Sequence, residues 1–532
     1  MTSFGWNRKQ PGADAPEAGK PATCDIDRIS RYFYNNAGEE QVCQTIDAET
    51  ASDLDLNAVF AEIDRTTSAI GRQVFYARLR TLRGEKECKA FGERVAWFAG
   101  RSETAERCRK GLRRIEDEAG YELQGLIFDT PARVRHVPWI AAASAASVLS
   151  LLGGLFVHPP LLLLFAALFT CNLWFHYSNK IHILRYTLAV GQLHRTLRVA
   201  RDLVHEKVPG TELMPGVLHE IARIRRRSRI VGHQGDNGNE FAALGFFVLE
   251  LVKIAFNIEV LLFHRFVKEI PARREAIHTL IRYVGETDAA LAVLQLRETQ
   301  PTCLPTFTDR KYLAAEEVRH PLIADCVPNT LRLDGSGLLL TGSNMSGKTS
   351  FIRTLALNAL LAETIDTCFA GTWTAPYLRI FSTIRITDDV SQGASYYLQE
   401  VLAVKRQLDA AEGQTPCLFA LDELFKGTNT PERIAAGKAV LARLNRGPHL
   451  VLCATHDIEL ATLLRKDGYE LHHFREEVVD GRLSFDYRLH AGALTTSNAI
   501  RILELYGYPP EVIAEARALQ RQRTARDIGE PD

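Results

Sequence analysis

The chain has 532 residues, enough for three or four domains of about 150 residues each. Apolar residues make up 46% and charged residues 24%, which excludes a collagen-like or wholly disordered protein. Lys plus Arg and Asp plus Glu both number 64, so the net charge of zero predicts no charged partner for the chain as a whole. The ten cysteines show no C-x-x-C spacing, which argues against disulfides or a zinc site and favours a reducing compartment.

The N-terminal region changes character near residue 46. Residues 1–23 are rich in Gly, Pro, Ala and charged residues and contain no apolar run typical of a signal peptide. We therefore predict a disordered or irregular tail over residues 1–45. From 46 to 136, apolar residues recur at three- and four-residue spacing, which predicts the first part of a helical core.

A stretch without Asp, Glu, Lys or Arg runs from His136 to Asn179 and is divided by His158-Pro159-Pro160. Each half is long enough to cross a hydrocarbon layer of about 30 Å as a helix. We therefore predict a transmembrane helical hairpin over 137–178, which makes membrane lipid a partner. The alternative is a buried hairpin in a soluble cytoplasmic protein. Basic residues flank both ends and predict that these ends, and the rest of the chain, face the cytoplasm at the cytoplasmic membrane: Arg133, Arg135, Lys180 and Arg185.

Residues 179–315 again show the spacing of amphipathic helices and are predicted to form a core or lever-like region. Within it, 241–263 is very apolar but carries three charged residues, each costing about 2.5 to 3.5 kcal/mol at membrane depth. We therefore expect a buried helix of a soluble domain there. Five arginines in seven residues are candidates for contact with DNA or lipid phosphates, with a solvated helix face as the alternative: Arg223, Arg225, Arg226, Arg227 and Arg229.

From 316 to 490, short apolar runs alternate with helical stretches, which is typical of an α/β domain with a mostly parallel sheet. One run is followed by the pattern G-x-x-x-x-G-K-T, in which backbone N–H groups and a helix N-terminus hold phosphates. Lys348 would reach the β- and γ-phosphates, and Thr349 would bind Mg²⁺, so ATP and Mg²⁺ are the expected cofactors. The candidate nucleotide-binding residues are Gly342, Ser343, Asn344, Met345, Ser346, Gly347, Lys348, Thr349 and Ser350.

Two further apolar runs end in polar residues suited to ATP hydrolysis. The run 417–421 is followed by Asp422 and Glu423, the pattern of a Walker B strand. Asp422 would hold Mg²⁺, and Glu423 would orient or deprotonate the attacking water. The run 450–453 leads to His456, which we assign as a γ-phosphate sensor, with a purely structural histidine as the alternative.

Together these motifs resemble the MutS family of DNA mismatch-repair ATPases, which belong to the ABC class of P-loop proteins. The resemblance implies a homodimer through the ATPase domain and a C-terminal helix-turn-helix over 491–532. It also implies that Ser395 acts in trans on the nucleotide of the other subunit. The similar segments are Arg319-His320-Pro321, the P-loop, Asp388-Asp389 with Ser391, Gly393 and Ser395, Asp422-Glu423 with 427–430, Ala454-Thr455-His456, and 499–519.

Three features depart from the family pattern. Only about 45 residues precede the core-like segment, so we expect a shortened member without the N-terminal mismatch-reading domain. Phe91-Gly92-Glu93 matches the mismatch-wedge pattern F-x-E but lies in a helical stretch, so we interpret it as a coincidence. Glu363 occupies the position where the family has Gln.

We therefore predict a P-loop ATPase domain of the ABC class, preceded by a mostly helical core that a transmembrane hairpin interrupts. The expected function is ATP hydrolysis in a dimer, coupled to binding of DNA (mismatched or otherwise structured) or of a partner at the membrane. The alternative is a membrane-anchored scaffold that binds ATP without a role in mismatch repair. A transporter ATPase is disfavoured because the chain contains no L-S-G-G-Q-type signature, and a soluble repair protein would need a mismatch reader.

Overall fold

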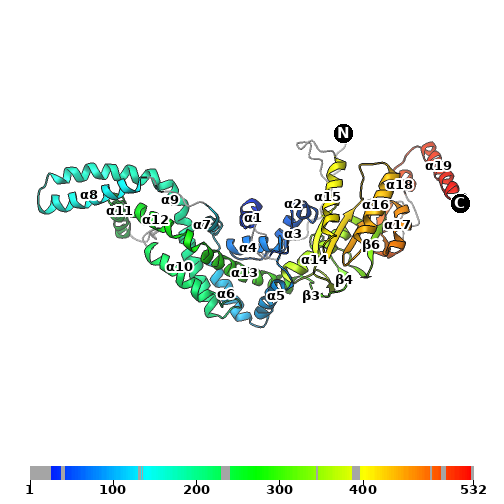
Figure 1. The fold of residues 1–532 in the computed structure, drawn as a ribbon, viewed down its shortest axis with the longest axis horizontal. Coiled ribbons are helices and arrows are strands. Elements are labelled where there is room, and N and C mark those ends of the chain that lie inside the picture. Colours follow the sequence, from blue (N-terminus) through cyan, green and yellow to red (C-terminus); the bar gives the residue numbers. More distant parts are fainter. Residues whose placement is uncertain are drawn as a thin grey trace.

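A helical arm and an α/β domain lie end to end in an elongated molecule (Figure 1). The structure is a computed structural model. It describes residues 25–36, 42–129, 134, 136–228, 240–342, 346–385, 396–479, 482–492 and 499–528.

The centre of the helical part is α13 (Arg274–Thr299), which crosses α4 (Ala69–Leu79). Every residue from 283 to 294 is buried, as expected for a helix surrounded by other elements. The crossing is close, because a Cβ on Gly285 would lie 2.4 Å from a methyl group of Val74. Asp288 accepts hydrogen bonds from the backbone N–H groups of Thr67 (3.0 Å) and Ser68 (2.7 Å) and so holds the start of α4.

The first helix lies where the sequence predicts an irregular tail. Helix α1 (Ile26–Asn35) buries Ile29, Tyr32 and Phe33 against the helical core. The Tyr32 hydroxyl lies 3.0 Å from Nε2 of His278 on α13. The prediction of a tail up to residue 45 is therefore wrong for this segment. Helix α1 directly follows the polar region and is itself rich in polar residues, so its sequence looks like a continuation of the tail. Residues 1–24 lie outside the described part.

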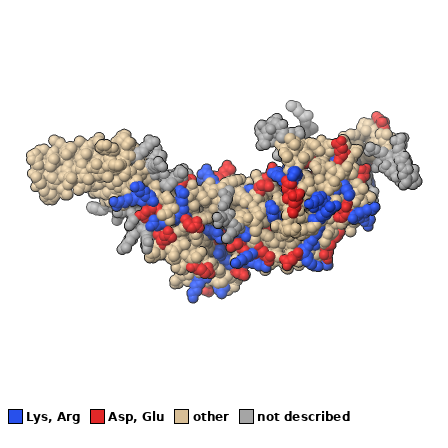
Figure 2. Space-filling view, in the orientation of Figure 1, with Lys and Arg blue, Asp and Glu red and all other residues tan. Residues whose placement is uncertain are grey.

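The charge-free stretch forms a long hairpin of α8 (Val137–Phe156) and α9 (Leu161–His205) at the free end of the arm (Figure 1). In the part of the chain that is described, 137–156 and 161–180 are the two helical segments long and apolar enough to cross a membrane. Only 28% and 11% of their most apolar windows are buried, unlike the core helix of a soluble protein. Figure 2 shows the hairpin as a protrusion without visible charged residues.

Small residues let the two hairpin helices pack closely. Ser144 and Ser147 are buried on α8, and a Cβ on Gly154 would lie 2.6 Å from the side chain of Leu162. Close packing of small residues is a common mode of helix association in membranes. Large apolar side chains point outward instead, and four of them are 71% to 81% exposed: Trp139, Leu149, Phe156 and Leu163.

The apolar segment 241–263 differs from its prediction in two ways. It forms two helices, α11 (Glu240–Ala255) and α12 (Ile258–Glu269), which turn at Asn257 with a left-handed φ of 45°. Asparagine tolerates this conformation better than most residues. The α11 side chains Phe247 and Val248 are exposed rather than buried. The remaining helices of the arm are α5 (Glu85–Ala99), α6 (Ser102–Arg113), α7 (Gly125–Phe128) and α10 (Met214–Ser228).

The α/β domain is built on a six-stranded sheet in the order β14-β11-β6-β10-β9-β8. All neighbours are parallel except β11 and β14. The apolar runs form strands because helices cover both faces of a parallel sheet. The strands are β6 (Gly337–Thr341), β8 (Arg379–Thr383), β9 (Cys417–Asp422), β10 (Leu450–Ala454), β11 (Tyr469–His473) and β14 (His490–Ala491). The helices of the domain are α14 (Lys348–Ile365), α15 (Tyr396–Ala410), α16 (Thr430–Leu444) and α17 (Ile458–Leu464).

A second sheet, in the order β3-β7-β4-β5, belongs to the same domain. Its first strand lies before residue 316, so the α/β domain begins earlier than the sequence predicts. The boundary is hard to place because β3 pairs with β7, 68 residues later in the chain. The strands are β3 (Pro305–Phe307), β4 (Tyr312–Val318), β5 (Asn329–Asp334) and β7 (Thr372–Ala375).

The helical core and the α/β domain are joined by a buried carboxylate. Asp53, at the end of α2 (Ala48–Asp53), accepts hydrogen bonds from the Ser382 hydroxyl (2.6 Å) and from the backbone N–H groups of Ile384 (2.9 Å) and Arg385 (2.7 Å). These residues lie at the end of β8. The two parts therefore share one continuous apolar core.

Two helices end the described chain and project away from the sheet (Figure 1). They are α18 (Ala499–Leu505) and α19 (Pro510–Ile528). Tyr506, Tyr508 and Leu519 on this pair are exposed.

Candidate nucleotide site

The sheet brings the two predicted phosphate motifs to one edge. Because β6, β10 and β9 run parallel, their carboxyl ends meet at the same edge of the sheet, where α/β proteins bind ligands. Strand β10 lies between β6 and β9, so the residues that follow β10 are placed between the P-loop and the Walker B strand.

The loop after β6 requires glycine at both of its ends. Gly342 has φ 145°, and a Cβ there would lie 2.7 Å from the carbonyl oxygen of Phe474. Gly347 has φ 105° and directly precedes α14. The helix N-terminus therefore points its free N–H groups into the loop, as an anion site requires. Ser343, Asn344 and Met345 lie outside the described residues.

Lys348 is buried at the first position of α14. Its Nζ donates a 2.6 Å hydrogen bond to the carbonyl oxygen of Gly342, across the loop. Burial lowers the pKa of Lys348, and the nearby carboxylates of Glu423 and Asp422 oppose this effect. A lysine in this position is well placed to bind the phosphates of a nucleotide.

Thr349 and Asp422 form a pair suited to Mg²⁺. The Thr349 hydroxyl donates a 2.6 Å hydrogen bond to Oδ2 of Asp422. The other carboxylate oxygen, Oδ1, is buried and has no hydrogen-bond partner among the described residues. Burial raises the pKa of Asp422, although the hydrogen bond from Thr349 opposes the rise. Hard cations prefer such oxygen ligands, so these residues fit a magnesium ion.

Glu423 sits in a strained turn after β9, where its side chain faces Lys426 and His456. Its φ is 52°, in the left-handed region, and its N–H donates a 2.9 Å hydrogen bond to the carbonyl oxygen of Ala454. Its carboxylate lies 2.8 Å from Nζ of Lys426 and 3.2 Å from Nδ1 of His456. Burial acts to raise the pKa of Glu423, but these two partners outweigh it and leave the pKa lowered.

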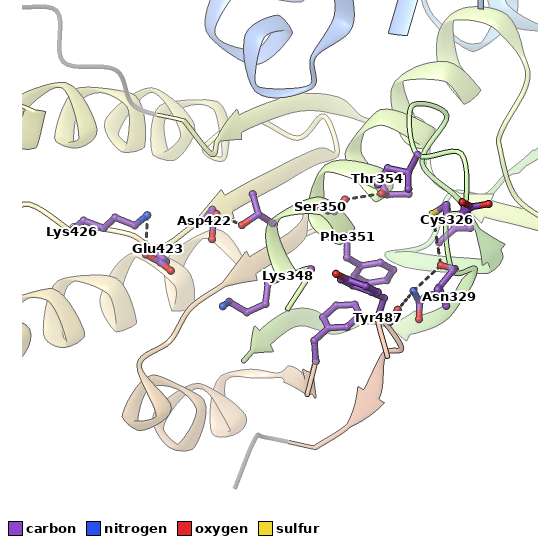
Figure 3. Close-up of a pocket in the computed structure, with 17 residues that line it drawn as sticks. Cys326, Asn329, Lys348, Ser350, Phe351, Thr354, Asp422, Glu423, Lys426 and Tyr487 are labelled. Carbon is purple, nitrogen blue, oxygen red and sulfur yellow. Dashed lines mark hydrogen bonds and ion pairs between the residues drawn. The ribbon is translucent and has the colours of Figure 1, made fainter. Parts of the chain in front are cut away.

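A cavity of about 730 Å³ extends from these polar residues toward an aromatic end. Figure 3 shows Lys348, Asp422 and Glu423 near one end and Phe351 and Tyr487 toward the other. The cavity is large enough for a small-molecule ligand. Its polar end suits phosphates, and its aromatic end suits a flat base.

The residues of the aromatic end include two that no sequence motif predicts. Tyr487 lies against Gly347, where a Cβ would be 3.4 Å from its ring. Asn329 on β5 donates a 2.9 Å hydrogen bond to the carbonyl oxygen of Tyr487 and accepts a 2.8 Å bond from the N–H of Leu489. These contacts join positions about 160 residues apart, so no local pattern could reveal them.

The other predicted nucleotide-binding residues have mixed outcomes. Ser346 is buried in the loop, and Ser350 lines the cavity, where its carbonyl oxygen accepts a 2.6 Å hydrogen bond from Thr354. The predicted trans-acting Ser395 lies outside the described residues, together with Asp388, Asp389, Ser391 and Gly393.

The arginine cluster is far from the nucleotide site. Four of its members lie on α10 in the arm, which Figure 1 places well away from β6. Their side chains are not described, and Arg229 lies outside the described residues: the four are Arg223, Arg225, Arg226 and Arg227.

Two departures from the family pattern have structural explanations. Phe91 is buried in α5 with the guanidinium of Arg78 4.0 Å from its ring centroid, so it could not act as a DNA wedge without unfolding the core. Glu363 is buried at the far end of α14 and accepts a 2.8 Å hydrogen bond from the N–H of Leu378. Burial raises its pKa well above the usual value, which favours a neutral carboxyl that ties α14 to the loop before β8.

Comparison with known proteins agrees with this geometry. Residues 338–523 match the family model of MutS domain V. The DNA mismatch repair protein MutS of Thermus aquaticus is 32% identical over 262 residues, which is 48% of this chain and 32% of that protein. The proteins of the same name from Staphylococcus haemolyticus and Chloroflexus aurantiacus are 28% and 30% identical, over 50% and 48% of this chain and 31% and 28% of their own length.

The chain thus spans about a third of the length of the curated relatives it matches. The similarity lies in the half that carries the P-loop, the Walker B strand and the C-terminal helices. Residues 338–523 therefore match MutS domain V, which has an ABC-like P-loop ATPase fold.

Proposed function

We propose that the chain is a MutS-type ATPase that binds and hydrolyses ATP with Mg²⁺. The observation that carries this proposal is the meeting of Thr349 and Asp422 at 2.6 Å, with a buried, unbonded oxygen on Asp422 and Glu423 next in the chain. This pair stands at the N-terminus of the helix that begins with Lys348. Thr349 and Asp422 would hold the metal, and Glu423 would face the attacking water.

In this mechanism each side chain has a separate task. Lys348 and the N–H groups at the start of α14 bind the β- and γ-phosphates and balance charge that develops during in-line attack of water. Thr349 and Asp422 would hold Mg²⁺, which supplies further charge neutralisation. Glu423 accepts the proton of the attacking water, and a lowered pKa keeps it ionised and ready to do so. His456, 3.2 Å from Glu423, orients that carboxylate and senses the γ-phosphate.

The proposed assembly is a homodimer. Its support is the match to MutS domain V and the exposed apolar residues that a second copy would cover: Tyr506 and Tyr508 in the turn between α18 and α19, and Leu519 on α19. In this dimer Ser395 would complete the nucleotide site of the partner subunit.

We further propose that the nucleotide state changes how tightly the arm binds DNA or a protein partner. The relatives are named as DNA mismatch repair proteins, and Asp53 connects the helical core to the end of β8 through three hydrogen bonds. A movement of β8 on ATP binding would therefore act directly on the arm. The arginines of α10 are the candidate phosphate contacts.

The hairpin is proposed to anchor the protein in the cytoplasmic membrane, with the ATPase domain in the cytoplasm. Two helices of sufficient length, outward-facing Trp139 and Phe156, and the absence of charged residues from 137 to 179 support this placement. Exposed apolar surface of this size in water would favour aggregation.

Native cysteines provide a direct test of the anchor. Cys171 is exposed on α9 within the hairpin, whereas Cys43 is exposed near the ATPase domain. In proteoliposomes, a membrane-impermeant maleimide should label Cys43 and leave Cys171 unlabelled until detergent is added. Equal labelling of both cysteines in intact vesicles would refute the anchor and leave the ATPase proposal intact.

ATP turnover by Glu423→Gln tests the enzymatic proposal. The variant should bind ATP with nearly normal affinity and hydrolyse it at least about a hundredfold more slowly, since general-base catalysis contributes roughly 10²–10⁴ in rate. Glu412→Gln, on the exposed surface after α15, is the matched control and should turn over normally. If wild-type protein binds ATP but shows no turnover above that of Glu423→Gln, the alternative of a non-hydrolysing scaffold is favoured.

A further inference from the structure

We infer that α11 and α12 enter the same bilayer as the hairpin, as a re-entrant pair of helices whose turn lies near the middle of the membrane. In this arrangement the exposed apolar face of α11 contacts lipid acyl chains. The inference rests on the proposed membrane anchor and extends it, because the anchor by itself requires only α8 and the first part of α9.

The depth of the turn follows from the way it packs against α9. The rings of Phe256 and Phe165 lie 6.4 Å apart. The side chain of Asn172 donates a 2.7 Å hydrogen bond to the carbonyl oxygen of Ala255 and accepts a 2.8 Å bond from Asn257. The turn at 255–257 is therefore held against the middle of the apolar segment 161–180.

The rise per residue of an α-helix gives the depth of these contacts in the bilayer. At 1.5 Å per residue, Phe165 lies about 6 Å and Asn172 about 17 Å from the Leu161 end of a segment about 30 Å long. If the hairpin crosses the bilayer, a turn fixed at these levels cannot remain at the cytoplasmic surface. Helix α11 has 16 residues and is about 24 Å long, which suffices to descend from that surface to the turn.

The surface of α11 is suited to lipid rather than water. Phe247, Val248, Leu249, Leu251 and Val252 are between 38% and 60% exposed. This patch adjoins the hairpin, since α11 contacts α9 and lies below the hairpin in Figure 1. We therefore expect lipid acyl chains to cover both this patch and the hairpin surface.

Several polar groups of this region are paired inside the protein, which lowers the cost of placing them in a membrane. Lys253 is buried and lies 2.6 Å from Glu250 one turn earlier on α11. Asn172 also donates to the hydroxyl of Ser147 on α8, so one amide joins α8, α9 and the end of α11. Charged residues at membrane depth are tolerated when they pair and face the interior of the bundle. An unpaired backbone carbonyl at a helix end costs free energy in lipid. Asn172 removes this cost for the carbonyl of Ala255 by donating a hydrogen bond to it.

Spin labels report this arrangement directly. The full-length protein, with its accessible native cysteines replaced by serine, is labelled at a single new cysteine and placed in vesicles of phosphatidylethanolamine and phosphatidylglycerol. The sites are Val248→Cys on α11, Leu163→Cys on the hairpin and Leu213→Cys on the exposed loop before α10. The measurement compares collision of each label with oxygen, which concentrates in lipid, and with a water-soluble nickel chelate.

The expected result is a severalfold higher ratio of oxygen to nickel collisions at Val248→Cys and Leu163→Cys than at Leu213→Cys. Leu251→Cys replaces Val248→Cys if the latter fails to incorporate. A nickel-accessible label at both α11 sites with a shielded label at Leu163→Cys would overturn the re-entrant pair and leave the anchor standing. A nickel-accessible label at Leu163→Cys would instead overturn the anchor itself, and the re-entrant pair with it.

Discussion

Asp55 of the helical core forms a 3.0 Å ion pair with Arg353 of the P-loop helix α14. Asp55 directly precedes α3 (Leu56–Ile63), and Arg353 follows Lys348 by five residues, a little more than one helical turn. The same carboxylate makes a two-pronged contact with Arg385, at 2.6 and 3.0 Å. Arg385 is the last described residue before 386–395, the segment that contains Ser395. One side chain therefore connects the arm, the P-loop helix and the chain that leads to the predicted trans-acting serine.

Replacing Asp55 with Asn should weaken this connection. Arg353 is largely buried, so removal of its charged partner should lower the free energy of unfolding by about 1.5 to 3 kcal/mol, in the range of hydrogen bonds to charged groups. Chemical denaturation measures the change. Asp309→Asn, at an exposed position, is the control and should alter stability by less than about 0.5 kcal/mol. Equal unfolding midpoints for the two variants would show that the ion pair does not hold the parts together.

Lys348→Ala should weaken ATP binding. Removing a charge-assisted hydrogen bond of about 1.5 to 3 kcal/mol corresponds to a decrease in affinity of roughly ten- to 150-fold. Titration with a fluorescent ATP analogue measures this decrease. Lys405→Ala, on the exposed face of α15, is the matched control and should bind like wild type. Unchanged affinity in Lys348→Ala would remove the phosphates from this end of the cavity.

The pH dependence of turnover should reveal the ion pair between Lys426 and Glu423. A general base must be deprotonated, so activity falls as the pH drops through its pKa. Because Lys426 and His456 lower the pKa of Glu423, the acid limb of wild type should lie below the usual carboxyl range. Lys426→Met removes one partner and should shift that limb to higher pH. The measurement is kcat against pH, with circular dichroism confirming that each variant stays folded, and an unshifted limb would mean that a different group limits turnover.

The sequence predicts this site better than it predicts the architecture around it. Lys348, Thr349, Asp422 and Glu423 lie in short motifs whose spacing along the chain places them at one edge of a parallel sheet. Tyr487 and Asn329 belong to the same cavity, but they depend on the packing of distant strands and carry no local pattern.

The wrong predictions in the helical part have a common physical origin. The turn at Asn257 is hidden in the sequence because apolar residues continue through it, and hydrophobic periodicity does not report a single left-handed residue. Helix α1 is hidden because its ten residues acquire their stability from contacts such as Tyr32 with His278, not from intrinsic helix propensity. The cost of burying 241–263 cannot be summed residue by residue, because the pairing of Lys253 with Glu250 changes the cost for both.

Asp288 should make the helical core less stable as the pH rises. Burial raises its pKa to about 6, above the value of 3.8 expected in the unfolded chain. A raised carboxyl pKa gives stability that is fully present below pH 3.8 and is lost as the pH rises from there through about 6. The decrease from this one group amounts to about 3 kcal/mol at 1.36 kcal/mol per pKa unit.

Asp288→Asn removes that titration and keeps one acceptor for the N–H groups of Thr67 and Ser68. The variant should be less stable than wild type at low pH, because its amide nitrogen cannot accept a hydrogen bond. The gap between the two should narrow as the pH rises from 3.8 through about 6 and should then stay constant. Denaturant unfolding of both proteins across this pH range measures the gap. A gap that does not change with pH would mean that Asp288 titrates near its usual value in the folded protein.

The arginines of α10 provide the test of DNA binding. Arg225, Arg226 and Arg227 changed together to Ala should reduce the slope of log affinity against log salt by up to about 3, since each phosphate that is no longer neutralised accounts for roughly 0.9. Fluorescence anisotropy with the detergent-solubilised full-length chain would compare matched, mismatched and branched duplexes, each with and without ATP. The control is Arg465→Ala with Lys466→Ala, two exposed basic residues of the ATPase domain. A reduced slope in the α10 variant alone, together with a preference for one duplex that ATP changes, would establish DNA as the partner of the arm. An unchanged slope would exclude these arginines as DNA contacts, and weak binding of every duplex would favour the membrane scaffold.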